Sequence, residues 1–222
     1  MAVEDFAAAP KGGKTGWKQD PEGVRADILA TALAEFAESG LSGARMDEIA
    51  AKTRTSKRMI YYYFGSKNEL YQKALEESYR AVRSGEEALE LDHLDPVSAL
   101  KRLTEFTFTH HRENPNFIRL VMIENIHKGQ YLAQSDTIKN LNRAAIANLD
   151  ALYERGVKTG VFREGLSPLR IHWLISAISF FNVSNATTFS LLFGSELYGD
   201  LGQKTACQDA SDAVLNFVRA QP

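Results

Sequence analysis

The sequence predicts an all-α fold with about nine helices. From Pro21 onward, apolar residues recur every three or four positions, which is the spacing of a helix with one buried face. Alternating apolar and polar residues, which are typical of strands, are essentially absent. Gly, Pro and capping residues interrupt the helical pattern, so the positions where helices begin and end can be predicted as well.

The first helices are delimited by local signals. The first predicted helix spans about 21–40 and is closed by a Ser-Gly pair. Ser66 and Glu69 form a capping box that opens a later helix, which is predicted to end at about Arg83 because Gly85 follows.

The remaining helices begin at a Ser or Asp cap or at a first-turn Pro, or end before a Gly or an Asn-Pro pair. Their predicted ranges are 96–113, 116–128, 135–159, 167–194 and 205–219. The segment 168–194 is apolar enough to raise the question of a membrane span, which needs about 20 consecutive apolar residues. Polar residues interrupt it, and we interpret it as a core or interface helix rather than a membrane helix.

Composition favours a cytoplasmic globular protein. The chain has 222 residues and a formal net charge of -2. Its single cysteine, Cys207, excludes an intrachain disulfide and fits a reducing compartment. Residues 1–20 lack the apolar core of a signal peptide and are predicted to form a flexible tail. Two domains are predicted to follow, at 21–72 and 73–222.

One segment is locally basic although the whole chain is not. Between Ile49 and Asn68 there are five cations and no Asp or Glu, a distribution that suits contact with a polyanion. The cations are Lys52, Arg54, Lys57, Arg58 and Lys67.

A helix-turn-helix is predicted at residues 46–64 within this segment. The first short helix covers about 46–52 with Ile49 facing inward, and a tight turn leads to a second helix at 57–63 that Ser56 can cap. Two short helices joined in this way place the second helix in the major groove of DNA, which is about 12 Å wide.

The first turn of the second helix is where a helix-turn-helix reaches base edges. Here it holds Lys57, Arg58 and Met59. Lys and Arg side chains can donate to guanine O6 and N7, so these positions are predicted to read sequence. Ile60 and Phe64 are predicted to dock the helix on the domain core.

The tyrosines that follow extend the predicted interface. Successive side chains on a helix point about 100° apart, so Tyr61, Tyr62 and Tyr63 cannot all be buried. An exposed tyrosine can donate its hydroxyl to a phosphate, and Lys67 at the start of the next helix adds a second phosphate contact.

Several fixed spacings together resemble the DNA-binding domain of the TetR family of repressors, over about residues 22–72. The matching residues are Arg25-x-x-Ile28-Leu29-x-x-Ala32-Leu33-x-x-Phe36-Ala37-x-x-Gly40, Ile49-Ala50, Ser56-Lys57 and Tyr61-Tyr62-x-Phe64-x-Ser66-Lys67-x-x-Leu70-Tyr71.

The resemblance implies a homodimer with a three-helix DNA-binding domain, a variable ligand-binding domain, and dimerisation through the last two helices. It places Lys57 and Arg58 at base-contacting positions, and Ser56, the three tyrosines and Lys67 mostly at phosphate-contacting ones. Arg45, directly before the first helix of the motif, is also expected to contact DNA.

The sequence departs from the family pattern at the turn. Arg54 and Thr55 stand where the family commonly has Gly and Val, so either Arg54 adopts a left-handed conformation, at about 1–2 kcal/mol, or the turn differs. Tyr63 stands where the family often has His, and Arg58 where it often has a small residue, which suggests a distinct operator preference.

Residues 75–222 hold no metal-spaced His/Cys cluster and no nucleophile elbow, so we expect neither an enzyme nor a cofactor. An apolar cleft between helices is the usual form of a small-molecule site. The side chains expected to contact an effector of unknown identity are Phe106, His110, Met122, Asn125, Ser176 and Phe180. Ordinary core packing of the same residues remains an open alternative.

The predicted function is a ligand-responsive repressor that binds a palindromic operator in double-stranded DNA as a homodimer and is released by a small molecule. The bulky face of 168–194, with Ala206, Val214 and Phe217, is expected to form the dimer seam. An activator or global regulator on the same fold remains an alternative, as does a helical protein whose basic helix meets a protein partner.

Overall fold

The computed structural model describes residues 20–220, and in that range it contains ten α-helices, short 3-10 helices and an isolated bridge between Phe162 and Arg219. The all-α prediction is confirmed. The predicted tail lies outside the described residues except for Asp20. No helix within 20–220 is long and apolar enough to cross a membrane.

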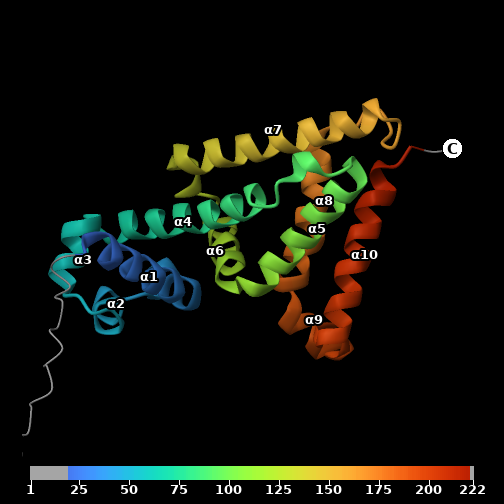
Figure 1. Ribbon diagram of the computed structural model, residues 1–222. Coiled ribbons are helices and arrows are strands. Elements are labelled where there is room, and N and C mark those ends of the chain that lie inside the picture. The colour runs from blue at the N-terminus through green and yellow to red at the C-terminus, as the bar shows by residue number, and fades with distance from the viewer. Residues whose placement is uncertain (1–19, 221–222) are drawn as a thin grey trace, which may run out of the picture.

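The helices fall into two groups that share one long helix. In Figure 1, the helices within residues 21–64 gather at one end of the long helix of residues 67–87, and the later helices lie along it and beyond its other end. The first group is α1 (Pro21–Gly43), α2 (Met46–Lys52), α3 (Lys57–Phe64) and α4 (Lys67–Glu87). The second is α5 (Pro96–Glu113), α6 (Pro115–Ile126), α7 (Asp136–Lys158), α8 (Pro168–Ser184), α9 (Ala186–Phe193) and α10 (Asp200–Val218).

Side-chain caps set several helix starts as predicted. The Asp95 carboxylate accepts from the backbone N–H groups of Val97 and Ser98, and the hydrogen bond with the Ser98 side chain, together with these backbone bonds, lowers the pKa of Asp95. Ser135 Oγ accepts from Ile138 N at 3.2 Å and begins α7. These bonds satisfy donors that a helix N-terminus leaves without partners.

Helix α4 is longer than predicted because Gly85 continues it instead of ending it. The helix runs to Glu87, about one turn beyond the predicted end at Arg83. A Cβ atom at Gly85 would lie 2.4 Å from Cζ of Phe106 on α5. The glycine therefore serves the close packing of α4 on α5 rather than the termination of a helix.

The predicted helix over 167–194 is two helices. It breaks at Asn185, whose backbone leaves the helical region (φ −106°, ψ 2°), and α9 continues in a new direction to Gly194. This break accounts for the tenth helix. The last helix also begins five residues earlier than predicted, at Asp200, after a short 3-10 turn at Glu196–Tyr198.

One hydrophobic core joins the first four helices to the second group. Phe36 of α1 and Tyr71 of α4 are fully buried, and their rings meet edge to face at 5.2 Å. Leu120 of α6 and Ile138 of α7 belong to the same core. Helices α1 and α4 are therefore packed directly on the second group, and α2 and α3 pack on α1 and α4.

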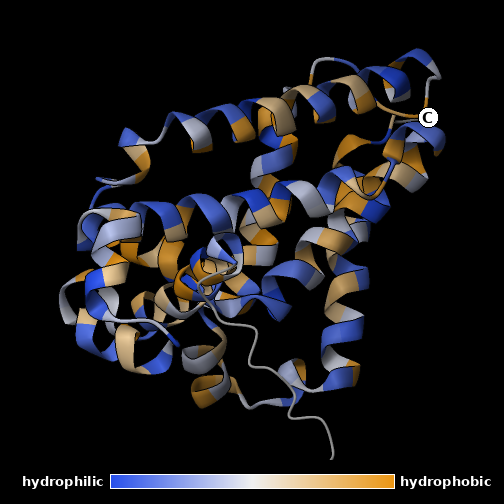
Figure 2. Ribbon diagram, turned by 60° about the vertical axis from the view of Figure 1, so that its left-hand side comes forward, coloured by the Kyte–Doolittle hydropathy of each residue, from blue (hydrophilic) through white to orange (hydrophobic). Residues whose placement is uncertain are grey.

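A second core lies among α5, α7, α8 and α10, and it corrects one prediction. Val214 is fully buried in this core, and Phe217 packs against it under the guanidinium groups of Arg163 and Arg170. These two side chains stabilise the single chain and do not form an exposed dimer seam. Hydrophobic and hydrophilic residues alternate around most helices, as expected for faces that are buried on one side (Figure 2).

An ion pair between a buried carboxylate and an exposed lysine joins α1 to α2. Glu35 is 5% exposed and accepts a hydrogen bond from Nζ of Lys52, one of the five cations of the basic segment. That hydrogen bond holds the pKa of Glu35 below its ordinary value of 4.5, against the opposing effect of burial. Lys52 is therefore a structural residue of the DNA-binding domain.

Replacing Lys52 by Met is expected to remove a pH-dependent part of the stability. Because the pKa of Glu35 is lower in the folded chain, its contribution is present above pH 4.5 and is lost as the pH falls through the folded pKa. The variant should unfold at lower urea concentration than the parent at pH 7, and the difference should shrink at low pH. A difference that stays constant between pH 7 and pH 3 would contradict this assignment.

Candidate nucleic-acid interface and interior cavity

Helix α3 begins and docks as the sequence predicts. Ser56 Oγ accepts from Met59 N at 3.3 Å and caps the helix, while Gly65, with a positive φ of 72°, ends it. Ile60 is fully buried and Phe64 nearly so. Burying these two residues on one side leaves the opposite side of α3 free to face a partner.

The outer side of α3 carries the predicted DNA-contacting side chains. Lys57, Arg58 and Met59 in its first turn are exposed, as are Tyr61 and Tyr62. Tyr62 is the most exposed of these aromatic residues, at 77%.

Tyr63 points differently from its two neighbours. It is only partly exposed and packs against the domain core. One of the three tyrosines thus docks the helix, and the two exposed ones extend the surface formed by its first turn.

Neighbouring groups partly neutralise and orient the basic side chains. Nζ of Lys57 forms an ion pair with Asp47 of α2 at 2.9 Å, and Nζ of Lys67 donates to the carbonyl of Ser42 at 3.5 Å. Arg45 is exposed at the start of α2. Exposed pairs of this kind contribute only about 0.2–1 kcal/mol, so Lys57 can exchange Asp47 for another acceptor at small cost.

The turn between α2 and α3 resolves the question raised by Arg54. Among the described residues other than glycine, only Glu90 and Lys128 have a positive φ. Arg54 is therefore not left-handed, and the turn has a different backbone from one built around a glycine. Thr53 Oγ1 donates to the carbonyl of Ala50 at 3.3 Å and helps to close α2.

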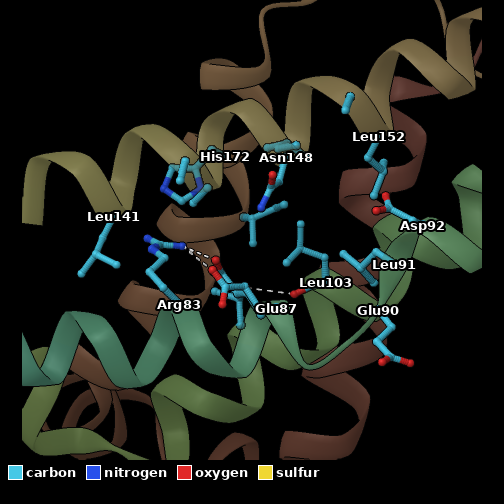
Figure 3. Close-up of a pocket in the computed structure, with 17 residues that line it drawn as sticks. Arg83, Glu87, Glu90, Leu91, Asp92, Leu103, Leu141, Asn148, Leu152 and His172 are labelled. Carbon is cyan, nitrogen blue, oxygen red and sulfur yellow. Dashed lines mark hydrogen bonds and ion pairs between the residues drawn. The ribbon is translucent and has the colours of Figure 1, made fainter.

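Two neighbouring pockets lie between α4 and the helices of the second group, and both are lined by Arg83, Glu86, Thr107 and His172, so we describe them as two lobes of one cavity. What we call the aliphatic lobe has a volume of about 330 Å³ and is drawn in Figure 3. Its apolar wall includes Leu91, Leu103, Leu141, Leu149, Leu152 and Ile175.

What we call the aromatic lobe has a volume of about 350 Å³. Its wall includes Tyr79, Val82, Phe117, Val121, Trp173 and Phe180. Both volumes fall within the range of small-molecule sites.

Arg83 lies where the two lobes meet and lines both of them. It is 9% exposed, and one guanidinium nitrogen (Nη1) pairs with the carboxylate of Glu86 while the other (Nη2) donates to Oδ1 of Asn142 at 2.8 Å. Figure 3 shows the Arg83 side chain reaching toward α7 from α4. The Arg83–Asn142 bond therefore connects the helix that carries the DNA-binding domain to a wall of the cavity.

Burial shifts the protonation of the groups around Arg83. It lowers the pKa of His111 to about 3 and that of His172 to about 4, with the charge of Arg83 acting in the same direction. It also raises the pKa of Glu86, although Arg83 opposes that shift. Both histidines are consequently uncharged near pH 7.

Three of the six side chains predicted to contact an effector lie together. Asn125, Ser176 and Phe180 line the aromatic lobe. His110 faces a different groove, between α1, α4 and α5, and the Phe106 ring packs on Gly85 and lies 5.6 Å from the His110 ring. Met122 is exposed on α6. The structure thus does not bring His110, Phe106 and Met122 into the cavity.

Sequence reasoning missed Arg83, His111, Asn142 and His172 as cavity residues. Arg83 lies at the position where α4 was predicted to end, so its packing against α7 could not be foreseen. The adjacent pair His110 and His111 points in two directions, and only the position of α8 decides which ring enters the cavity. The sequence signal that could have identified Arg83 is that it is a charged residue among the apolar positions of α4.

No group of three or more His, Cys, Asp or Glu side chains within 20–220 is arranged to hold a metal ion. Within the described residues, the cavity therefore offers a ligand hydrogen-bonding groups, the Arg83–Glu86 ion pair and apolar surface. An exposed basic α3 docked on a compact helical domain defines a helix-turn-helix DNA-binding protein, with a cavity domain attached.

Comparison with protein families identifies the class more closely. Residues 28–74 match the model described as bacterial regulatory proteins of the tetR family, and residues 96–214 match the tetracyclin repressor-like C-terminal domain. The chain belongs to the TetR family of transcription regulators, whose members are DNA-binding regulators and not enzymes.

Similar proteins support the same assignment along nearly the whole chain. The transcriptional repressor NicS of Pseudomonas putida is 33% identical over 211 residues, which cover 93% of this chain and 98% of NicS. The repressor SCO4008 of Streptomyces coelicolor is 35% identical over 111 residues, covering 50% of this chain and 54% of SCO4008. The crystal structure of the putative regulator SCO4942 of Streptomyces coelicolor has a TM-score of 0.67 at 26% identity, covering 88% of this chain and 98% of that one.

Proposed function

We propose that this chain is a homodimeric transcriptional repressor that binds a palindromic operator in the cytoplasm and leaves it when a small molecule occupies the interior cavity. The observation that carries the proposal is the capped α3, which buries Ile60 and Phe64 and exposes Lys57, Arg58, Tyr61 and Tyr62 together. The relatives NicS and SCO4008 are both named as transcriptional repressors.

Selection of bound fragments from genomic DNA, followed by titration at several salt concentrations, tests DNA binding. Each phosphate neutralised by the protein should contribute about −0.9 to the slope of log affinity against log salt. The selected site should be an inverted repeat whose halves lie about 34–36 Å apart, or a multiple of that distance. A flat salt response, or a site without twofold symmetry, would argue against a dimeric DNA-binding protein.

The proposed dimer face is the outer side of α8 and the start of α10. An open apolar groove there, of about 530 Å³, is lined by residues that include Ile178, Phe181, Leu197 and Ala206. Phe181 is 51% exposed, although it is large and apolar. Two chains related by a twofold axis would cover such faces with each other, because the same patch is present on both.

Replacing Phe181 by Asp is expected to convert the protein to a monomer at micromolar concentration. The substitution places a charge in the centre of an apolar contact, where it would lose its hydration. Sedimentation equilibrium measures the mass directly. Ile126→Asp is the matched control because Ile126 is 74% exposed but lies on α6, away from the groove. A Phe181→Asp protein that remains dimeric would place the interface elsewhere.

The proposed response to an effector rests on the bond between Arg83 and Asn142. A ligand that rearranges Arg83 changes a direct tie between α4 and α7, and α4 carries the helix-turn-helix. A ligand that prefers the rearranged state lowers operator affinity by no more than that preference. Asn142→Ala should therefore change the effector dependence of operator binding more than it changes the affinity of the ligand-free protein.

A further inference from the structure

The interior cavity contains polar groups that have no partner of their own. Nε of Arg83 and Nδ1 of His111 are buried and have no hydrogen-bond partner within the described residues. Both residues are more than nine-tenths buried, and both line the aromatic lobe. The Nε–H of Arg83 is a donor, and a buried donor without an acceptor is destabilising, so a bound molecule whose acceptor atom this side chain turns toward would be favoured.

The charges at the boundary between the two lobes sum to zero. The cation of Arg83 is balanced by the carboxylate of Glu86, and burial keeps His111 and His172 uncharged near pH 7. A ligand carboxylate would have to share the guanidinium with Glu86, and an ammonium group would face Arg83. Three further carboxylates at the aliphatic lobe, those of Glu87, Glu90 and Asp92, are exposed, so solvent and salt screen them.

The walls of the aromatic lobe select for shape. Tyr79, Phe117 and Phe180 come from three helices and, together with Trp173, which is 69% exposed, border a space that suits a flat ring system. Asn125 and Ser176 add neutral hydrogen-bonding groups at the same wall.

We propose that the effector is an uncharged aromatic molecule with a carbonyl-type acceptor, that its ring occupies the aromatic lobe, and that the Arg83–Glu86 pair selects against charged ligands. This inference rests on the proposed function in that it takes the cavity to be the effector site. It adds the chemical class of the ligand and the residues that set its charge.

Four probes of one shape test the charge preference in the full-length protein at pH 7. They are 2-naphthamide, 2-naphthoate, 2-naphthylmethylammonium and 2-methylnaphthalene, and their affinities are measured by calorimetry and by the rise in melting temperature. We expect 2-naphthamide to bind at least about tenfold more tightly than each of the others. Equal or tighter binding of a charged probe or of 2-methylnaphthalene, or no binding of 2-naphthamide at millimolar concentration, would overturn the proposal.

Charge substitutions at the boundary should reverse the preference in opposite directions. Glu86→Gln leaves Arg83 unbalanced, so 2-naphthoate should gain about tenfold or more over 2-naphthamide. Asn142→Asp adds a negative charge beside Arg83, so 2-naphthylmethylammonium should gain instead. Glu154→Gln is the control because it makes the same charge change at an exposed position on α7 that lines neither lobe, and it should leave the order unchanged.

The two substitutions keep the test decisive even if one of them prevents folding. An unchanged order of affinities in whichever variant folds, or the same shift in Glu154→Gln, would show that the Arg83–Glu86 pair does not set the preference. None of these readouts involves DNA. If the protein binds its operator but does not show the predicted probe preference, the ligand inference fails and the proposed function stands. If the protein does not bind the operator, the proposed function itself fails.

Discussion

Replacing Lys57 and Arg58 together by Ala is expected to lower operator affinity by at least about thirtyfold. Each good bidentate contact to a base contributes about 1–3 kcal/mol, and every 1.4 kcal/mol is about tenfold in affinity. The ion pair with Asp47 that Lys57 gives up on binding offsets only a small part of this, because both groups are exposed. Fluorescence anisotropy with the selected operator, and with a scrambled duplex of equal length, measures the loss.

The matched control removes the same charge from another helix. Arg102 and Arg112 are exposed on α5, so Arg102→Ala with Arg112→Ala changes the net charge equally without touching α3. If the α3 double variant loses affinity for the operator and the scrambled duplex alike, then Lys57 and Arg58 contribute to attraction and not to sequence recognition. If both double variants lose operator affinity equally, α3 is not the recognition helix.

Replacing Glu124 by Ala is expected to lower the free energy of unfolding by about 3 kcal/mol or more. The buried Glu124 carboxylate accepts from the hydroxyl of Tyr71 at 3.0 Å and from the backbone N–H groups of Tyr131 at 3.2 Å and Leu132 at 3.0 Å. Removing it leaves three donors without partners, at about 1–3 kcal/mol each. Urea unfolding measures the change, provided that the m-value stays constant.

Two milder variants show how much of this loss in the free energy of unfolding comes from each hydrogen bond to Glu124. Tyr71→Phe removes one of the three hydrogen bonds and keeps the carboxylate, so it should cost about 1 kcal/mol. Glu124→Gln keeps the shape but turns one acceptor into a donor, and should fall between the two. A Glu124→Ala protein no less stable than Tyr71→Phe would mean that water replaces the lost carboxylate at this site.

The helix-turn-helix could be predicted from the sequence because its signals are local. The Ser56 cap, the inward residues Ile60 and Phe64, and the exposed first turn all lie within nine residues and follow from helical periodicity. The same periodicity predicts that the three tyrosines cannot all be buried, but it does not single out Tyr63, which the structure packs against the core. Nothing distant in the chain has to be known.

The cavity could be predicted only in part because it depends on contacts between distant helices. Helix α8 is apolar on nearly every side, so its sequence does not show which face meets the cavity and which meets a partner chain. The break at Asn185 and the burial of Val214 depend on how α8, α9 and α10 pack. The choice between His110 and His111 is a rotation of about 100° that only the neighbouring helices decide.

Because α4 is unbroken, a small tilt at one end of the helix produces a larger displacement at the other end. Lys67 begins this helix and Arg83 lies sixteen positions further along it, a distance of about 24 Å at 1.5 Å per residue. A tilt of about 8° about the Arg83 end moves the other end by about 3 Å, close to the rise of one base pair. In a twofold dimer the displacement doubles. The length of this helix therefore determines how small a rearrangement at the proposed ligand site would move the two recognition helices of the proposed dimer out of step with successive major grooves.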